Sequence, residues 1–100
     1  MSEVVMTIDP EPQEYLEAQY DRDPVLAARI DDFLDVLEDD PHDPEIHKRA
    51  HALRDANGEY FSAATVRSAV SEAMVFWREE TDDSTVLVRV IYIGDNTLRL

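Results

Sequence analysis

The sequence predicts a single α+β domain in which one strand and two acidic helices precede a three-stranded antiparallel meander. Its 100 residues are typical of one domain, which we assign to residues 1–100. Residues 24–39 carry an apolar stripe with helical spacing. Three runs rich in β-branched, small apolar and aromatic residues follow residue 58, joined by short links.

The first predicted strand is the apolar run Glu3–Ile8, which ends at Asp9-Pro10. Asp9 is predicted as the N-cap of a first helix, with Pro10 at its first position, because proline lacks only an N–H that the helix does not use there. This helix is expected to end near Asp21.

Asp23-Pro24 repeats the same start signal for a second helix. Leu26, Ile30 and Leu37 fall on one face of this helix, and its opposite face is acidic. Asp40-Pro41 ends it. This is the clearest local pattern in the chain.

The pattern is weaker from residue 42 to residue 58. Pro44 and Glu45 predict one or two helical turns that reach Leu53, and Asn57-Gly58 predicts a turn before a strand. The three later strands are expected at residues 60–70, 72–78 and 85–93, with a polar turn at residues 79–84. The helices must bury their apolar stripe on one face of the sheet, which leaves the other face available to a partner.

Composition excludes several classes of function. The chain has no cysteine, so it forms no disulfide framework or thiolate metal site. Neither a secretory signal nor an apolar run long enough to cross a membrane is present, so a cytoplasmic location without membrane association is expected. The formal net charge of −14 disfavours non-specific binding to nucleic acid.

The charge is unevenly distributed. Residues 1–45 hold 15 acidic and 2 basic residues, whereas residues 46–78 hold 3 acidic and 5 basic residues. An anionic ligand is therefore expected to meet the middle segment. An acidic surface also occurs in proteins of halophilic or high-GC sources, which is the alternative explanation.

The order of elements resembles the RelE/ParE toxin superfamily over nearly the whole chain. The resemblance lies in the helix at residues 24–39, the sequence His47-Lys48-Arg49 and the strand entry Gly58-Glu59-Tyr60-Phe61. Met74-Val75-Phe76-Trp77-Arg78 and Val86–Gly94 are similar to the two strands that follow in that family.

The resemblance implies a RelE-like fold and the toxin component of a toxin–antitoxin module, silenced by an antitoxin protein. In the RelE branch the implied activity is ribosome-dependent cleavage of mRNA, and in the ParE branch it is inhibition of gyrase. Cleavage requires a base, an acid and a cation near the phosphate, but no cofactor. A homodimer is left open.

Candidate residues for this chemistry come from the less acidic segment. The predicted catalytic residues are His47, His51, Arg67 and Arg78, and the predicted RNA-binding residues are Lys48, Arg49, Arg54, Tyr60 and Trp77.

Each candidate also has a structural interpretation. A helix through both His47 and His51 would place the two imidazoles on one face, but exposed or capping histidines are the alternative. A metal site is not predicted, because these two side chains would need a third ligand such as Asp43 or Asp55. The arginines could bind phosphate or form surface ion pairs with the acidic helices. The aromatic residues could stack on bases or belong to the core.

Two further hypotheses use no catalysis. The chain could be a degenerate or gyrase-directed toxin-like protein that acts only by binding. Alternatively, its acidic first half could imitate a phosphate backbone and occupy the nucleic-acid channel of a basic protein.

Overall fold

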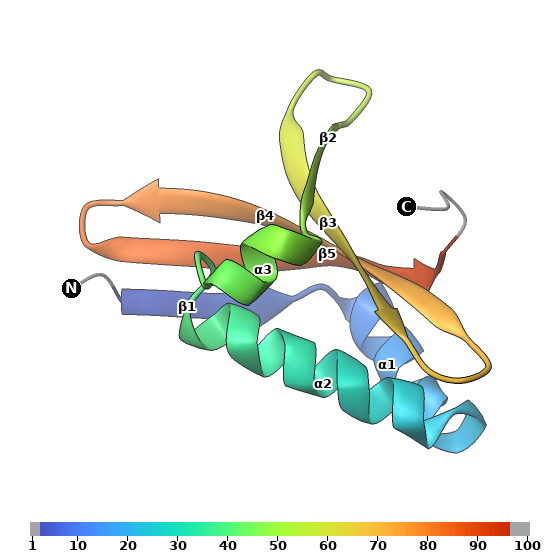
Figure 1. Ribbon diagram of the computed structural model, residues 1–100. Helices are drawn as coiled ribbons and strands as arrows, with labels where there is room; N and C mark the ends of the chain where they lie inside the picture. Colours follow the sequence, from blue (N-terminus) through green and yellow to red (C-terminus); the bar gives the residue numbers. More distant parts are fainter. Residues whose placement is uncertain (1–2, 97–100) are drawn as a thin grey trace.

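The computed structural model describes residues 3–96, which form a mixed five-stranded sheet and three helices (Figure 1). The strand order is β1-β5-β4-β3-β2. The elements are β1 (Glu3–Ile8), α1 (Pro10–Arg22), α2 (Pro24–Asp39), α3 (Pro44–Arg49), β2 (His51–Arg54), β3 (Tyr60–Arg67), β4 (Glu72–Asp82) and β5 (Thr85–Asp95). The predicted α+β class, the first strand and the two long helices are confirmed.

The start of α2 follows the predicted chemistry. The carboxylate of Asp23 accepts a hydrogen bond of 3.1 Å from the N–H of Leu26, and Pro24 occupies the first turn. Leu26, Ile30 and Leu37 are fully buried on the sheet side of the helix. Each such side chain contributes about 1.5–3 kcal/mol through its removal from water, so the apolar stripe fixes α2 on the sheet.

The sheet is mixed because its first and last strands pair in parallel. β1 pairs with β5 from Glu3↔Thr85 to Ile8↔Val90, whereas β3, β4 and β5 pair antiparallel in sequence order. The sequence predicted the antiparallel pairs but not the parallel one. A parallel neighbour requires a long crossover, which here consists of all the elements between β1 and β5.

One predicted helical segment ends earlier than expected. The one or two turns predicted from Pro44 are confirmed as α3, but the helix does not continue to Leu53. α3 ends at Arg49, Ala50 is extended, and His51–Arg54 form β2. β2 pairs antiparallel with β3 from His51↔Ala63 to Arg54↔Tyr60. Pairing with β3 satisfies the backbone of this segment, so a four-residue run with little strand pattern becomes a strand.

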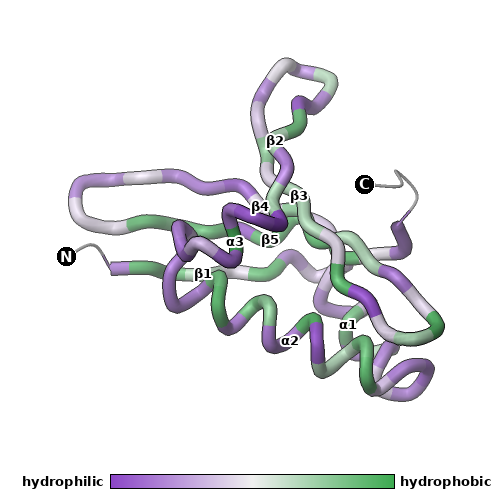
Figure 2. The backbone as a smooth tube through the Cα atoms, viewed as in Figure 1, coloured by the Kyte–Doolittle hydropathy of each residue, from purple (hydrophilic) through white to green (hydrophobic). Residues whose placement is uncertain are grey.

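The predicted polar turn at residues 79–84 is also too long. β4 continues to Asp82 and β5 starts at Thr85, so only Asp83 and Ser84 form the turn. Asp83 adopts a positive φ of 44°, which aspartate tolerates better than most residues. The end of this hairpin is hydrophilic because it extends into solvent beyond the helices (Figure 2).

The two faces of the sheet differ. α1 and α2 cover one face, where Val75, Trp77, Val88 and Val90 join the helix side chains in the core. We call the opposite side the open face. A β-bulge lies between Phe76 and Trp77 of β4, where Phe76 pairs with Tyr92 and Trp77 with Val90. The extra residue is Ile91 of β5, which has no partner in β4. It lets Val90 and Ile93 both point to the core while Tyr92 points to the open face.

None of the helices in residues 3–96 combines the length and the apolar character that crossing a membrane requires.

Candidate functional site

Three aromatic side chains cross the open face on three neighbouring strands. The rings of Phe61 and Phe76 lie 5.0 Å apart, and those of Phe76 and Tyr92 lie 4.9 Å apart. All three are half-buried, and they lie on the face of the sheet opposite α1 and α2. We call this set the aromatic row. Such tilted ring pairs attract each other beyond their burial, so the row is a rigid apolar surface.

Arg78 borders the aromatic row. Its guanidinium donates a hydrogen bond of 2.6 Å to Oδ2 of Asp55 and one of 3.1 Å to the carbonyl of Tyr60. Its centre also lies 5.7 Å from the ring of Phe61, and Glu59 is 3.8 Å away. The pKa of Asp55 is lowered, first by the backbone N–H of Glu59 and also by Arg78. The predicted catalytic cation is thus neutralised by a carboxylate.

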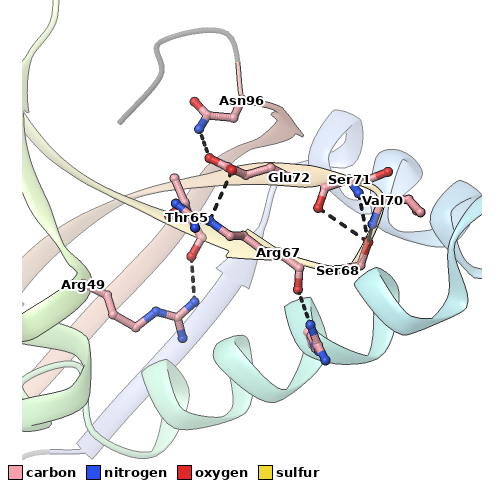
Figure 3. A network of polar contacts seen from close by, with 9 residues as sticks. Arg49, Thr65, Arg67, Ser68, Val70, Ser71, Glu72 and Asn96 are labelled. Atoms are coloured by element: carbon pink, nitrogen blue, oxygen red, sulfur yellow. Dashed lines mark hydrogen bonds and ion pairs between the residues drawn. The ribbon is translucent and has the colours of Figure 1, made fainter.

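Arg67 lies at the other end of β3 (Figure 3). Its Nε is 3.2 Å from Oε2 of Glu72, and the side-chain amide of Asn96 donates a hydrogen bond to Oε1 of the same carboxylate. Arg78 contacts Tyr60 at the beginning of β3, and seven residues of extended chain span roughly 23 Å. The structure therefore does not bring Arg67 and Arg78 together around one phosphate.

The histidines are also separated. His47 belongs to α3 and its ring lies 6.2 Å from that of His42, whose Nε2 is 2.5 Å from Oε1 of Glu79. His51 belongs to β2 and lies opposite Ala63, so it shares the open face with Phe76. The expectation that a helix would carry both His47 and His51 is wrong, because the chain changes direction at Ala50.

Trp77 is not a stacking residue. Its side chain is only 2% exposed and meets the ring of Phe33 edge-on at 5.6 Å. Every second residue of β4 points to the core, and Trp77 is one of them. The prediction that it stacks on RNA is therefore corrected.

Three other predicted RNA contacts lie away from the aromatic row. Tyr60 is 61% exposed, and the guanidinium of Arg54 lies 4.6 Å above its ring and donates to its hydroxyl. Lys48 forms an exposed pair with Glu45 within α3. Arg54 and Tyr60 thus lie on the hairpin of β2 and β3, and Lys48 lies on α3.

A groove of about 360 Å³ lies where α2, α3 and β3 meet. Three arginines border it, and its floor is apolar. Arg49 donates a hydrogen bond of 2.6 Å to the carbonyl of Thr65 (Figure 3). Arg29 donates one of 2.8 Å to the carbonyl of Arg67. We call this the arginine groove; its lining includes Arg29, Arg49, Arg67, Phe33, Ile46 and Val66.

Arg29 was not predicted as a functional residue. It stands alone among acidic residues on α2, and nothing nearby in the sequence points to the carbonyl that it contacts. Arg49 was predicted, but as a phosphate contact. Its guanidinium instead lies 4.8 Å above the ring of Phe33 and caps β3.

A second hollow lies between α1 and the end of β5, lined by Glu11, Tyr15, Tyr92 and Asp95. The hydroxyl of Tyr15 donates a hydrogen bond of 2.9 Å to Oδ1 of Asp95. Burial, and then this carboxylate, raise the pKa of Tyr15, so the phenol stays protonated at neutral pH. The contact ties the first helix to the last strand.

No family model, curated protein or solved structure matches the chain. Within residues 3–96, no group of three or more histidine or carboxylate side chains is arranged to hold a metal ion.

Proposed function

We propose that this chain is the toxin component of a bacterial toxin–antitoxin module and that it acts by binding a protein target, with gyrase as the first candidate. The observation that carries the proposal is the aromatic row. Phe61, Phe76 and Tyr92 form an ordered apolar surface on the sheet face opposite α1 and α2. Aromatic side chains are enriched at the centres of protein–protein interfaces.

The order of elements adds support. A strand and two long helices precede strands β3, β4 and β5, and this order is the one on which the resemblance to the RelE/ParE superfamily rests. An antitoxin is the expected partner under this proposal.

Binding is favoured over RNA cleavage by the surroundings of the arginines. Arg67 is paired with Glu72 and Arg78 with Asp55, at opposite ends of β3. A cation already neutralised by a carboxylate stabilises a phosphate less than an unpaired one. The net charge of −14 further disfavours approach to RNA.

The test is expression of the chain alone in bacteria, with Phe61→Ser beside a control, Val70→Ser. Val70 is 83% exposed in the turn between β3 and β4, away from the aromatic row. We expect the wild type and V70S to arrest growth and purified protein to inhibit supercoiling, and F61S to lose both effects with its melting curve retained. Harmless expression of the wild type would contradict the proposal.

Cleavage of mRNA is the second candidate, favoured by the position of His51. This imidazole shares the open face with the aromatic row, where a base could stack beside a proton-transfer group. The candidate predicts shortened transcripts after expression, and loss of the shortening in His51→Ala but not in His42→Ala. Growth arrest with intact transcripts would exclude it in favour of protein binding.

The salt dependence of target binding distinguishes the two candidate functions, protein binding and mRNA cleavage, from that of an acidic inhibitor that imitates nucleic acid. Contacts through the aromatic row should depend only weakly on salt, because apolar burial is not screened. Affinity that falls steeply between low and physiological salt would instead favour the acidic surface as the binding element.

A further inference from the structure

On the side away from β4, only the first half of β3 pairs with another strand. β2 pairs with residues 60–63 only, so Ala64 to Arg67 have no strand beside them on that side within residues 3–96. The carbonyls of Thr65 and Arg67 point to this edge, where Arg49 and Arg29 donate to them. In an extended strand the N–H of a residue points to the same edge as its carbonyl. The N–H groups of Thr65 and Arg67 therefore also face the arginine groove.

Two side chains, not a neighbouring strand, occupy the hydrogen-bonding groups at this edge of β3. Sheets block their edges to avoid unwanted pairing, and here two guanidinium groups from α2 and α3 do so. Each guanidinium has five N–H donors, so it retains donors after its carbonyl contact. Arg49 and Arg29 belong to α3 and α2, so loss of their contacts with the carbonyls would leave the hydrogen bonds between the strands intact.

We propose that the edge of β3 from Thr65 to Arg67 is a docking site for an extended segment of another protein that carries carboxylate side chains. The incoming backbone would replace the arginines on the two carbonyls and engage the N–H groups of Thr65 and Arg67. Arg29 and Arg49, once displaced, would bind the carboxylates of the segment. This site lies on the helix side of the sheet and does not depend on the proposed function of the aromatic row.

Charge complementarity identifies the occupant. Three of the nine lysine and arginine residues of the chain border this one groove, although the net charge is −14. Arginine and carboxylate form strong, often two-point hydrogen bonds. Asp32 and Glu45 also line the groove, so the carboxylates of the segment must lie on the side of the arginines.

The groove also fits the alternation of an extended segment. Ile46 and Val66 are buried at its floor, and Phe33 lies beneath Arg49. Successive side chains of a strand point to opposite faces. A segment that alternates acidic and apolar residues would place its apolar side chains on this floor and its acids toward the rim.

The test uses a short acetylated and amidated peptide in which valine and glutamate alternate. We expect it to slow hydrogen exchange at the amides of Thr65 and Arg67, measured by NMR, and to leave the outer edge of β1 unchanged. Arg49→Gln and Arg29→Gln should each weaken binding about tenfold. Arg22→Gln, an exposed arginine at the end of α1, should not change it.

Two peptide controls need no change to the protein, and they decide the question even if a groove variant does not fold. Replacement of glutamate by lysine should abolish binding, because it reverses the charge. Methylation of alternate backbone nitrogens should also abolish it, because the donors to β3 are lost. The proposal is overturned if either control peptide binds like the original or if the Thr65 and Arg67 amides exchange unchanged. Concentration-dependent protection of these amides without peptide would also overturn it, since the edge would then pair with a second copy of the chain.

Discussion

Arg78 of β4 donates a hydrogen bond of 2.6 Å to Asp55, which lies in the turn between β2 and β3. The second oxygen of the same carboxylate accepts the backbone N–H groups of Asn57 and Glu59 at 2.8 and 3.0 Å. One carboxylate thus closes the turn and connects it to the neighbouring strand.

Asp55→Asn should lower stability at neutral pH. The pKa of Asp55 is lowered in the folded state, so its contribution is present above the unfolded pKa of about 3.9 and is lost as pH falls through the folded value. Thermal melts of the variant and the wild type should therefore differ at pH 7 and converge as the pH falls below the folded pKa of Asp55. Asp82→Asn removes an exposed carboxylate at the end of β4 and is the control. It should melt like the wild type throughout the same pH range.

Leu26→Ala should destabilise the fold strongly, while Val25→Ala should not. The two residues are adjacent in α2, but Leu26 is 0% exposed and Val25 is 52% exposed. Loss of a buried leucine costs about 2–5 kcal/mol, whereas a surface change usually stays within about 0.5 kcal/mol. Denaturant unfolding measures both, and equal effects would show that α2 is not packed as described.

Asp31→Asn should stabilise the protein at neutral pH. The pKa of Asp31 is raised by burial first and then by the charges of Asp35 and Asp32. Because the pKa is raised in the folded state, the protonated carboxyl of Asp31 favours folding below the unfolded pKa of about 3.9. This contribution is lost as the pH rises through the folded pKa. The variant should melt higher than the wild type at pH 7 and equally below about pH 3. Glu14→Gln on α1 is the control, and an equal gain there would attribute the effect to net charge alone.

Gly94→Ala should act through Tyr92. A methyl group at Gly94 would overlap the hydroxyl and ring carbons of Tyr92, and overpacking of this kind typically costs about 1–3 kcal/mol. The cost should largely disappear in a Tyr92→Ala background, because the obstacle is then absent. A double-mutant cycle measures the coupling, and additive effects would mean that the two side chains do not meet.

The helices were predictable because their signals are local. Pro24 follows an N-cap aspartate, and Leu26, Ile30 and Leu37 repeat with the period of a helix. Asp9 shows the limit of such reasoning. It occupies the predicted N-cap position of α1, yet its carboxylate accepts two hydrogen bonds from Arg89 at 2.9 and 3.1 Å and makes no capping bond from its side chain. A residue 80 positions away decided its partner.

The sheet was less predictable because its pairings are long-range. β2 has no alternating pattern and is a strand only because β3 lies beside it. β4 is apolar on both faces, so its sequence could not show that Trp77 enters the core while Phe76 faces outward. The arginine groove was missed for the same reason, since Arg29 and the carbonyl of Arg67 meet only in the folded chain.

The parallel pairing of β1 with β5 has a consequence for synthesis in the cell. β1 is synthesised well before β5, the strand beside which it lies in the sheet of residues 3–96. Val4, Met6 and Ile8 therefore remain without this sheet partner until β5 has left the ribosome. A nascent chain that stalls before Thr85 leaves β1 without the strand that it pairs with in the folded domain.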